Sequence, residues 1–167
     1  MDCQITYTPL SGIEIPPSVT LPELVQQCRF GNQFPPVQSW GYRVTHRGPR
    51  QLSLAEFSRD MWWESEIETV YHHLIRHQLE FALIEDLLAA KLHAMHNETM
   101  STGTVLCLGS PIVGDLNPLY QRIYRDNLVF DPYEGCSSKR CRVLVAEFQG
   151  TPTARSPHFP FPKQPAQ

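Results

Sequence analysis

The chain has no run of apolar residues approaching the roughly 18 that a membrane-spanning helix needs. Its beginning, MDCQITYTPL, has neither the basic region nor the apolar region of a secretory signal. These two absences predict no membrane contact and an intracellular location, either cytoplasmic or nuclear.

The cysteines lack a regular pattern. There are five, an odd number at irregular spacing, which is a poor disulfide framework and favours a reducing compartment. The two in CSSKRC, residues 136–141, have no second pair nearby to complete four zinc ligands. We interpret them as one loop cysteine and one strand cysteine.

Positive charge is not in excess, since 14 Lys and Arg face 17 Asp and Glu and the net charge is −3. This balance disfavours nucleic acid as a partner without excluding it. Residues 39–50 nevertheless interleave aromatic and basic side chains, which could stack on bases and contact phosphates. The candidate contacts of an RNA-binding accessory protein are Trp40, Tyr42, Arg43, Arg47 and Arg50. The alternative is a strand whose aromatic side chains pack inward.

At 167 residues the chain is long enough for one domain with a substantial core. We expect a single globular domain over 1–149, followed by a proline-rich flexible tail over 150–167. In that tail, Phe159 and Phe161 stand between prolines and are candidate docking residues for a partner protein.

Alternating or compact apolar segments predict strands near 3–8, 40–46, 103–108 and 141–148. The sequence TLPE at 20–23 predicts a capped helix over 21–28, because Thr20 can cap it and Pro22 suits its first turn. A second capping box, SLAE at 53–56, predicts a helix that carries Leu54 to Trp62. NPLYQRIYRD, at 117–126, predicts another short helix, and NLVF a brief strand.

Residues 66–96 contain neither proline nor glycine and follow a third capping box, so we predict one long helix there. An apolar stripe recurs every seven residues along it, as in a helix-bundle seam, and is either core or a dimer surface. Its members are Ile67, Leu74, Phe81, Leu88 and Met95. The expected fold is therefore α+β, with a small, mainly antiparallel sheet packed against this helix and shorter flanking helices.

His73 and His77 would lie one turn apart on that helix, with Glu80 next along the same edge. Two imidazoles and a carboxylate suit zinc or iron, although no further ligand is evident beyond His46 or Asp115 as guesses. The alternative is a polar helix edge without a ligand, so no cofactor is assured.

Glu85 would fall on the apolar face of the same helix. A carboxylate there must find a partner or keep its proton. With Arg43, Arg122 or Arg142 as partner it would be structural, and without one it is a candidate catalytic group.

The sequence contains neither a phosphate-binding loop nor a nucleophile elbow, and Cys107 sits in an apolar strand where an inert thiol is expected. These absences favour a non-enzymatic regulatory or accessory protein that binds a protein partner, or itself, through a helix face or the tail. A metal-dependent enzyme or metal-binding protein is the alternative, and an RNA-binding accessory protein is a further one.

Overall fold

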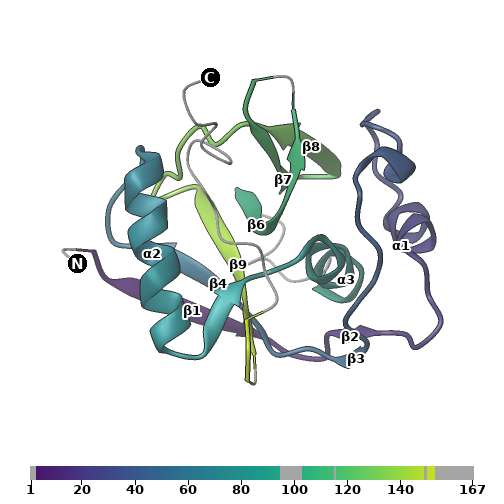
Figure 1. The fold of residues 1–167 in the computed structure, drawn as a ribbon, viewed down its shortest axis with the longest axis horizontal. Helices are drawn as coiled ribbons and strands as arrows, with labels where there is room; N and C mark the ends of the chain where they lie inside the picture. The colour runs from purple at the N-terminus through teal and green to yellow at the C-terminus, as the bar shows by residue number, and fades with distance from the viewer. Residues whose placement is uncertain (1–2, 95–102, 115, 149, 153–167) are drawn as a thin grey trace.

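A computed structural model describes residues 3–94, 103–114, 116–148 and 150–152 of the chain. A mixed sheet of seven strands runs through the protein in the order β1-β4-β9-β6-β7-β8, with β5 also paired to β9 (Figure 1). Its strands are β1 (Ile5–Leu10), β4 (Leu52–Phe57), β5 (Leu79–Phe81), β6 (Thr104–Val113), β7 (Pro118–Tyr124), β8 (Asn127–Asp131) and β9 (Cys141–Glu147). Two short strands, β2 (Glu14–Ile15) and β3 (Gly48–Pro49), form a separate pair.

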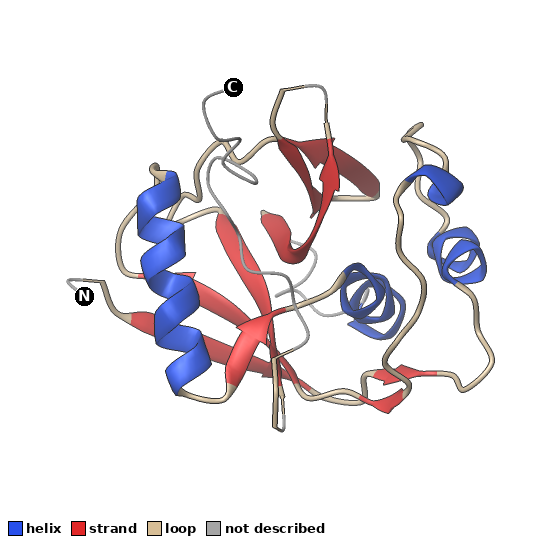
Figure 2. Cartoon of the chain, viewed as in Figure 1, coloured by secondary structure: helices blue, strands red, loops and turns tan. Residues whose placement is uncertain are grey.

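Helices cover both faces of the sheet. The helix α2 (Glu64–Arg76) lies on one side, while α1 (Leu21–Cys28) and α3 (Ile84–Ala94) lie on the other (Figure 2). A short 3-10 helix, η1 (Val37–Ser39), follows α1. Successive side chains of a strand point to opposite faces, so each strand contributes to two cores. In β9, Val143 and Val145 pack with α2, and Leu144 packs with α1 and α3.

Helix α1 confirms the prediction for 21–28. The hydroxyl oxygen of Thr20 accepts a hydrogen bond from the backbone N–H of Glu23 at 3.3 Å, and Pro22 lies in the first turn. The helix buries Leu21, Leu24 and Cys28 against the core.

Among the described residues, no helix combines the length and the apolar character that a membrane span requires.

The prediction of one long helix over 66–96 is wrong. Helix α2 ends at Arg76, Gln78 takes a left-handed conformation with φ of 60°, and the chain enters β5 before α3 begins at Ile84. The helical pattern of the segment is overridden because β5 forms antiparallel hydrogen bonds with β9. The stripe residues Ile67, Leu74, Phe81 and Leu88 are fully buried in the two cores, and Met95 lies outside the described residues.

The expected α+β fold with a small antiparallel sheet on one long helix is therefore also wrong, because the protein is a mixed α/β fold with a large mixed sheet. Strands β6 and β9 pair in parallel. The helix expected from 53 onward is strand β4, and the helix expected over 117–126 is β7. Residues 40–46 form no regular strand. The predictions of strands near 3–8, 103–108 and 141–148 are confirmed by β1, β6 and β9, and NLVF lies in β8.

One edge of β9 is shared by two strands. Strand β6 pairs in parallel with residues 141–143, and β5 pairs antiparallel with residues 145–147. Because β4 already pairs with residues 143–146, β5 must lie on the same edge of β9 as β6. At the junction, the N–H of Gly109 donates to the carbonyl oxygen of Ala82 at 3.0 Å, and the pairing of β6 with β7 is irregular between Cys107 and Ile112.

Gly109→Ala is expected to lower the free energy of unfolding by about 2–4 kcal/mol, because the junction has no room for a methyl group. A Cβ atom at Gly109 would lie 2.5 Å from the carbonyl oxygen of Phe81 and closer still to that of Ala82. Urea denaturation followed by circular dichroism measures the change.

The matched control is Gly31→Ala, where the new methyl carbon would lie 3.6 Å from its nearest neighbour, Oδ1 of Asn127. Its effect should stay below about 1 kcal/mol. Equal effects of the two substitutions would contradict the close approach of β6 to the turn that follows β5.

Candidate functional site

His73 and His77 come together at the end of α2. Their ring centroids are 4.5 Å apart, and Nδ1 of His77 donates to the carbonyl oxygen of His73 at 2.9 Å. Burial, together with His77 and Arg76, lowers the pKa of His73, which favours the neutral imidazole that a metal ion requires.

Glu80, the third predicted metal ligand, lies elsewhere. It is buried on β5, opposite Ala146 of β9, because the helix has ended four residues earlier. Among the residues that the structure describes, no group of three or more His, Cys, Asp or Glu side chains could hold a metal ion. Zinc or iron binding by His73, His77 and Glu80 stays a prediction, and Asp115 lies outside the described residues.

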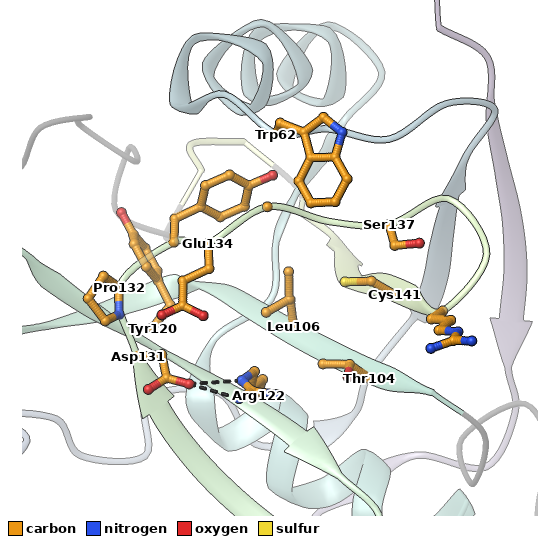
Figure 3. A pocket seen from close by; sticks show the side chains of 13 residues that line it. Trp62, Thr104, Leu106, Tyr120, Arg122, Asp131, Pro132, Glu134, Ser137 and Cys141 are labelled. Atoms are coloured by element: carbon orange, nitrogen blue, oxygen red, sulfur yellow. Dashed lines mark hydrogen bonds and ion pairs between the residues drawn. The ribbon is translucent and has the colours of Figure 1, made fainter.

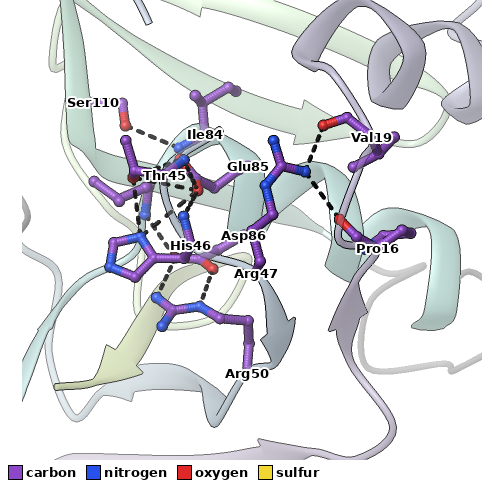
Figure 4. A network of polar contacts seen from close by, with 11 residues as sticks. Pro16, Val19, Thr45, His46, Arg47, Arg50, Ile84, Glu85, Asp86 and Ser110 are labelled. Carbon is purple, nitrogen blue, oxygen red and sulfur yellow. Dashed lines mark hydrogen bonds and ion pairs between the residues drawn. The ribbon is translucent and has the colours of Figure 1, made fainter. Parts of the chain in front are cut away.

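Glu85 is buried in the first turn of α3, and its carboxylate accepts hydrogen bonds from the loop before β3 (Figure 4). The backbone N–H groups of Thr45 and His46 donate to its Oε2 at 2.8 and 2.6 Å. Nδ1 of His46 lies 3.6 Å from the same oxygen. The contacts drawn in Figure 4 for Glu85 are thus with this loop, and not with Arg43, Arg122 or Arg142, which the sequence offered as possible partners.

Asp86, next along α3, forms a bidentate ion pair with Arg50. Nε and Nη2 of Arg50 donate to the two carboxylate oxygens at 2.7 and 3.0 Å, and the N–H of Leu83 donates to Oδ2 at 3.0 Å. Burial alone would lower the pKa of Arg50, but its hydrogen bond to Asp86 and the charges of Asp86 and Glu85 raise it. The guanidinium therefore stays charged and joins the loop to the helix.

We call the cavity in front of these groups the His46 hollow. Its volume is about 330 Å³, and it is lined by His46, Pro49, Arg50, Gln51, Glu80, Glu147, Phe148 and Thr151. It brings an imidazole, a guanidinium and two carboxylates to one surface. An imidazole beside a carboxylate can transfer protons in catalysis. Here, however, Arg50 is bound to Asp86 and Glu85 is bound to the backbone of His46, and both contacts hold the loop against α3.

The predicted nucleic-acid contacts are divided between the core and the surface. Trp40 is only 3% exposed, and its ring centroid lies 4.9 Å from that of Phe130. The hydroxyl of Tyr42 donates to the carbonyl oxygen of Pro111 at 2.6 Å. Both aromatic side chains therefore face inward, as the alternative interpretation expects, although the strand of that interpretation does not form.

The arginines of this segment differ among themselves. Nη1 of Arg47 donates to the carbonyl oxygens of Pro16 and Val19, at 2.9 and 2.6 Å (Figure 4). Arg43 is exposed, and Arg50 is paired with Asp86. Nucleic-acid binding stays a prediction, with Arg43 and Arg47 as its exposed cations. The docking residues Phe159 and Phe161 lie outside the described residues.

A second cavity, which the sequence did not reveal, opens beside an exposed indole (Figure 3). We call it the Trp62 hollow. Its volume is about 250 Å³, and it is lined by Trp62, Thr104, Leu106, Tyr120, Arg122, Asp131, Pro132, Tyr133, Glu134, Gly135, Ser137, Arg140 and Cys141. Trp62 is 56% exposed, and its neighbour Trp63 is 71% exposed.

The indole of Trp62 is held by the loop that precedes β9. Met61 and Cys136 exchange two backbone hydrogen bonds at 2.8 Å, and the hydroxyl of Tyr133 donates to the carbonyl oxygen of Met61. Gly135 has φ of 106°, and a Cβ atom there would lie 2.5 Å from Cε3 of Trp62. The ring thus packs against a backbone that only glycine supplies, which keeps it positioned at the hollow.

The polar groups of the Trp62 hollow carry both signs of charge. Nη2 and Nε of Arg122 donate to Oδ2 of Asp131 at 2.9 and 3.1 Å (Figure 3). Glu134 and Arg140 are exposed. An aromatic face beside balanced charges suits a ligand that has both an apolar surface and polar groups. In the sequence, only the adjacent Trp62 and Trp63 could have pointed to this site. Whether an indole is exposed depends on the tertiary fold, so the sequence did not predict it.

Comparisons with protein-family models, with curated proteins and with solved structures found no match to this chain.

Asp86→Ala should lower the free energy of unfolding by about 3–5 kcal/mol, because it leaves Arg50 charged and without its carboxylate partner. The control is Asp131→Ala, which breaks the pair of Arg122 Nη2 and Asp131 Oδ2 at 2.9 Å, where the two side chains are 33% and 31% exposed. That change should cost no more than about 1 kcal/mol. Chemical denaturation distinguishes the two, and a cost for Asp86→Ala as small as that of the control would contradict a structural role for the pair.

Glu85 should make stability depend on pH. Burial raises its pKa, and Asp86 adds to this, against the opposing hydrogen bonds from His46 and Thr45. A raised pKa means that the folded state binds the proton more tightly than the unfolded chain does. This contribution to stability is fully present below the ordinary value of 4.5 and is lost as the pH rises through the folded pKa.

The measurement is the difference in free energy of unfolding between the native protein and Glu85→Gln. It should favour the native protein more at about pH 5 than at about pH 7.5. A difference that stays constant, or that grows toward the higher pH, would show that burial does not control this carboxyl group.

Proposed function

We propose that this protein acts without catalysis, through protein–protein contacts, and that the Trp62 hollow receives a proline-containing segment of its partner. The observation that carries the proposal is the exposed indole of Trp62, which is positioned beside a preformed cavity. An exposed aromatic side chain of this size is a frequent anchor of binding free energy in protein interfaces.

The walls of the hollow suit proline. Pro132 and Leu106 lie around the cavity with Trp62 (Figure 3). Tyr133 also lines it, together with Tyr120, which is only 2% exposed. Pyrrolidine rings pack on aromatic faces, and a polyproline II segment is already extended, so that less conformational entropy is lost on binding. A cavity of about 250 Å³ is suited to one or two side chains of such a segment.

The charges at the rim select among proline-containing segments. Asp131 is already paired with Arg122, whereas Glu134 is exposed. A lysine or arginine that flanks the proline would therefore meet Glu134. A charge-assisted hydrogen bond of this kind orients the bound segment more than it adds affinity, because the rim is open to water.

The His46 hollow supports the non-enzymatic part of the proposal. Its arginine and the acids beside it stabilise contacts between α3 and the loop of residues 44–50. Catalytic groups must be positioned and yet available to a substrate, and these groups are engaged in holding the fold.

Trp62→Ala should abolish most of the binding to proline-containing peptides, with an increase in Kd of about tenfold or more, because a central aromatic contact is lost. The probe is an array of ten-residue peptides with paired prolines, in which the flanking positions are varied. Affinities of the best peptides for the full-length protein are then measured by fluorescence anisotropy.

The matched control is Trp63→Ala, which removes a neighbouring and more exposed indole that does not line the hollow. It should leave the Kd within about twofold of the native value. Glu134→Lys should reverse the preference for a basic flanking residue. An array without a binder, or equal losses in the two tryptophan variants, would overturn the proposal.

A further inference from the structure

The main sheet ends in β1 on one side and in β8 on the other, and these two edges differ (Figure 1). The outer edge of β8 is covered by the side-chain amide of Asn32. Its Nδ2 donates to the carbonyl oxygen of Leu128 at 2.7 Å, and its Oδ1 accepts from the N–H of Leu128 at 2.9 Å. Among the described residues, no strand pairs with the outer edge of β1.

The pairing of β1 with β4 determines which backbone groups of β1 point outward. In an antiparallel pair, only alternate residues exchange hydrogen bonds with the partner strand. The N–H of Ser58 donates to the carbonyl oxygen of Gln4 at 2.9 Å, so the backbone of Gln4 faces β4. The N–H and carbonyl groups of Ile5 and Tyr7 therefore point away from β4. Pro9 has the same orientation, which suits a residue that has no N–H to donate.

The outer edge of β1 has few of the features that protect an edge strand from pairing. Natural edge strands commonly carry lysine or an inward charge, or are interrupted by a bulge. Residues 3–13 contain no charged side chain. The register of β1 with β4 is continuous over six residue pairs. Pro9 is near the end of the strand, and its outward carbonyl oxygen can still accept a hydrogen bond. An extended strand can therefore add to this edge.

We propose that β1 pairs antiparallel with β1 of a second copy of the chain, about a two-fold axis at Thr6, and that the two sheets become one. In this register, Ile5 of each copy lies opposite Tyr7 of the other. Each such pair exchanges both of its outward backbone hydrogen bonds. The inference stands on the free edge of β1 and does not depend on the peptide proposed for the Trp62 hollow.

The side chains of β1 suit a second copy because they are complementary to themselves in this register. Ile5 and Tyr7 are half-buried against the core beneath α2, and across the two-fold axis they form pairs of an aromatic with a β-branched side chain. Thr6 is exposed on the other face and meets Thr6 of the second copy, which is also a favourable cross-strand pair. Since the strand carries no charge, its copies do not repel each other.

This interface replaces the dimer surface that the sequence offered. The described members of the seven-residue apolar stripe are fully buried in the two cores of the protein. Packing within the chain therefore already uses that stripe, whereas the edge of β1 is open among the described residues.

The first experiment is sedimentation equilibrium of the full-length protein over a range of concentrations. A species of twice the chain mass of 19.1 kDa should increase with concentration. Thr6→Lys and Thr6→Glu should each raise the dissociation constant of the dimer by about tenfold or more, because like charges then lie directly opposite each other. An equimolar mixture of the two variants should restore the dimer, because opposite charges then meet.

The matched control is Thr69→Lys, which places the same charge on an exposed threonine of α2. It should leave the dissociation constant within about twofold of the native value. Far-UV circular dichroism of every variant checks that the fold is kept, and recovery of the dimer in the mixture separates charge repulsion from misfolding.

Thr6→Cys tests the register itself. Opposite residues of a non-hydrogen-bonded antiparallel pair have Cα atoms about 4.5 Å apart, which a disulfide can span. Oxidised glutathione should therefore link two chains of Thr6→Cys. Thr8→Cys should stay unlinked, because Thr8 would lie opposite Gln4 of the second copy. The native protein is the background control, since its five cysteines are buried.

Several results would overturn the proposal. One is a monomer at every concentration up to about 1 mM, which would leave the edge to a strand of a different protein. Another is a dimer that Thr6→Lys does not weaken, or that Thr69→Lys weakens equally. A mixture of folded Thr6→Lys and Thr6→Glu that stays monomeric, or a link through Thr8→Cys in place of Thr6→Cys, would also contradict it.

Discussion

The junction at Gly109 and Ala82 is the constraint on which the rest of this fold depends. Strand β9 is central, and its second edge is paired first by β6 and then by β5. The backbones of β6 and of the turn after β5 must approach closely there, as the 3.0 Å hydrogen bond between Gly109 and Ala82 shows. Only a residue without a side chain permits that approach. The contact lets β5 and β6 share that edge of β9, where the pairing of β5 ends the helical segment of α2, and α3 begins two residues after Ala82.

The start of α3 in turn explains the buried acids. Ser110, which follows the junction, accepts a hydrogen bond from the N–H of Ile84 at 2.9 Å, so the first turn of α3 is held against β6. Glu85 and Asp86 then face the loop of residues 44–50, where backbone N–H groups and Arg50 meet them. Acidic groups in a first helical turn also interact favourably with the helix dipole. Glu85, the candidate catalytic group of the sequence, thus accepts hydrogen bonds from the backbone just before β3.

Local chemistry made some of the fold predictable. Helix α1 follows from Thr20 and Pro22, whose effects need no distant partner, and β9 follows from its β-branched residues. The sequence alone could not show that residues 66–96 contain two helices separated by a strand, because the helical pattern continues through β5. Only the pairing of β5 with β9 ends the first helix. The SLAE capping box failed similarly, since β4 lies between β1 and β9. Of the predicted metal ligands, His73 and His77 came together because both belong to one turn, whereas Glu80 depended on that missed strand.

The Trp62 hollow could not be predicted because it is built from segments that meet only in the folded chain. Residues 60–62 lead into α2, and residues 133–141 lead into β9. Their mutual hydrogen bonds close the hollow on one side, while Leu106 and Arg122 of β6 and β7 close it on the other (Figure 3). The same contacts that expose the indole of Trp62 bury the thiol of Cys136, one residue from the glycine against which the indole packs. A ligand at the indole would therefore also act on the loop that buries this thiol.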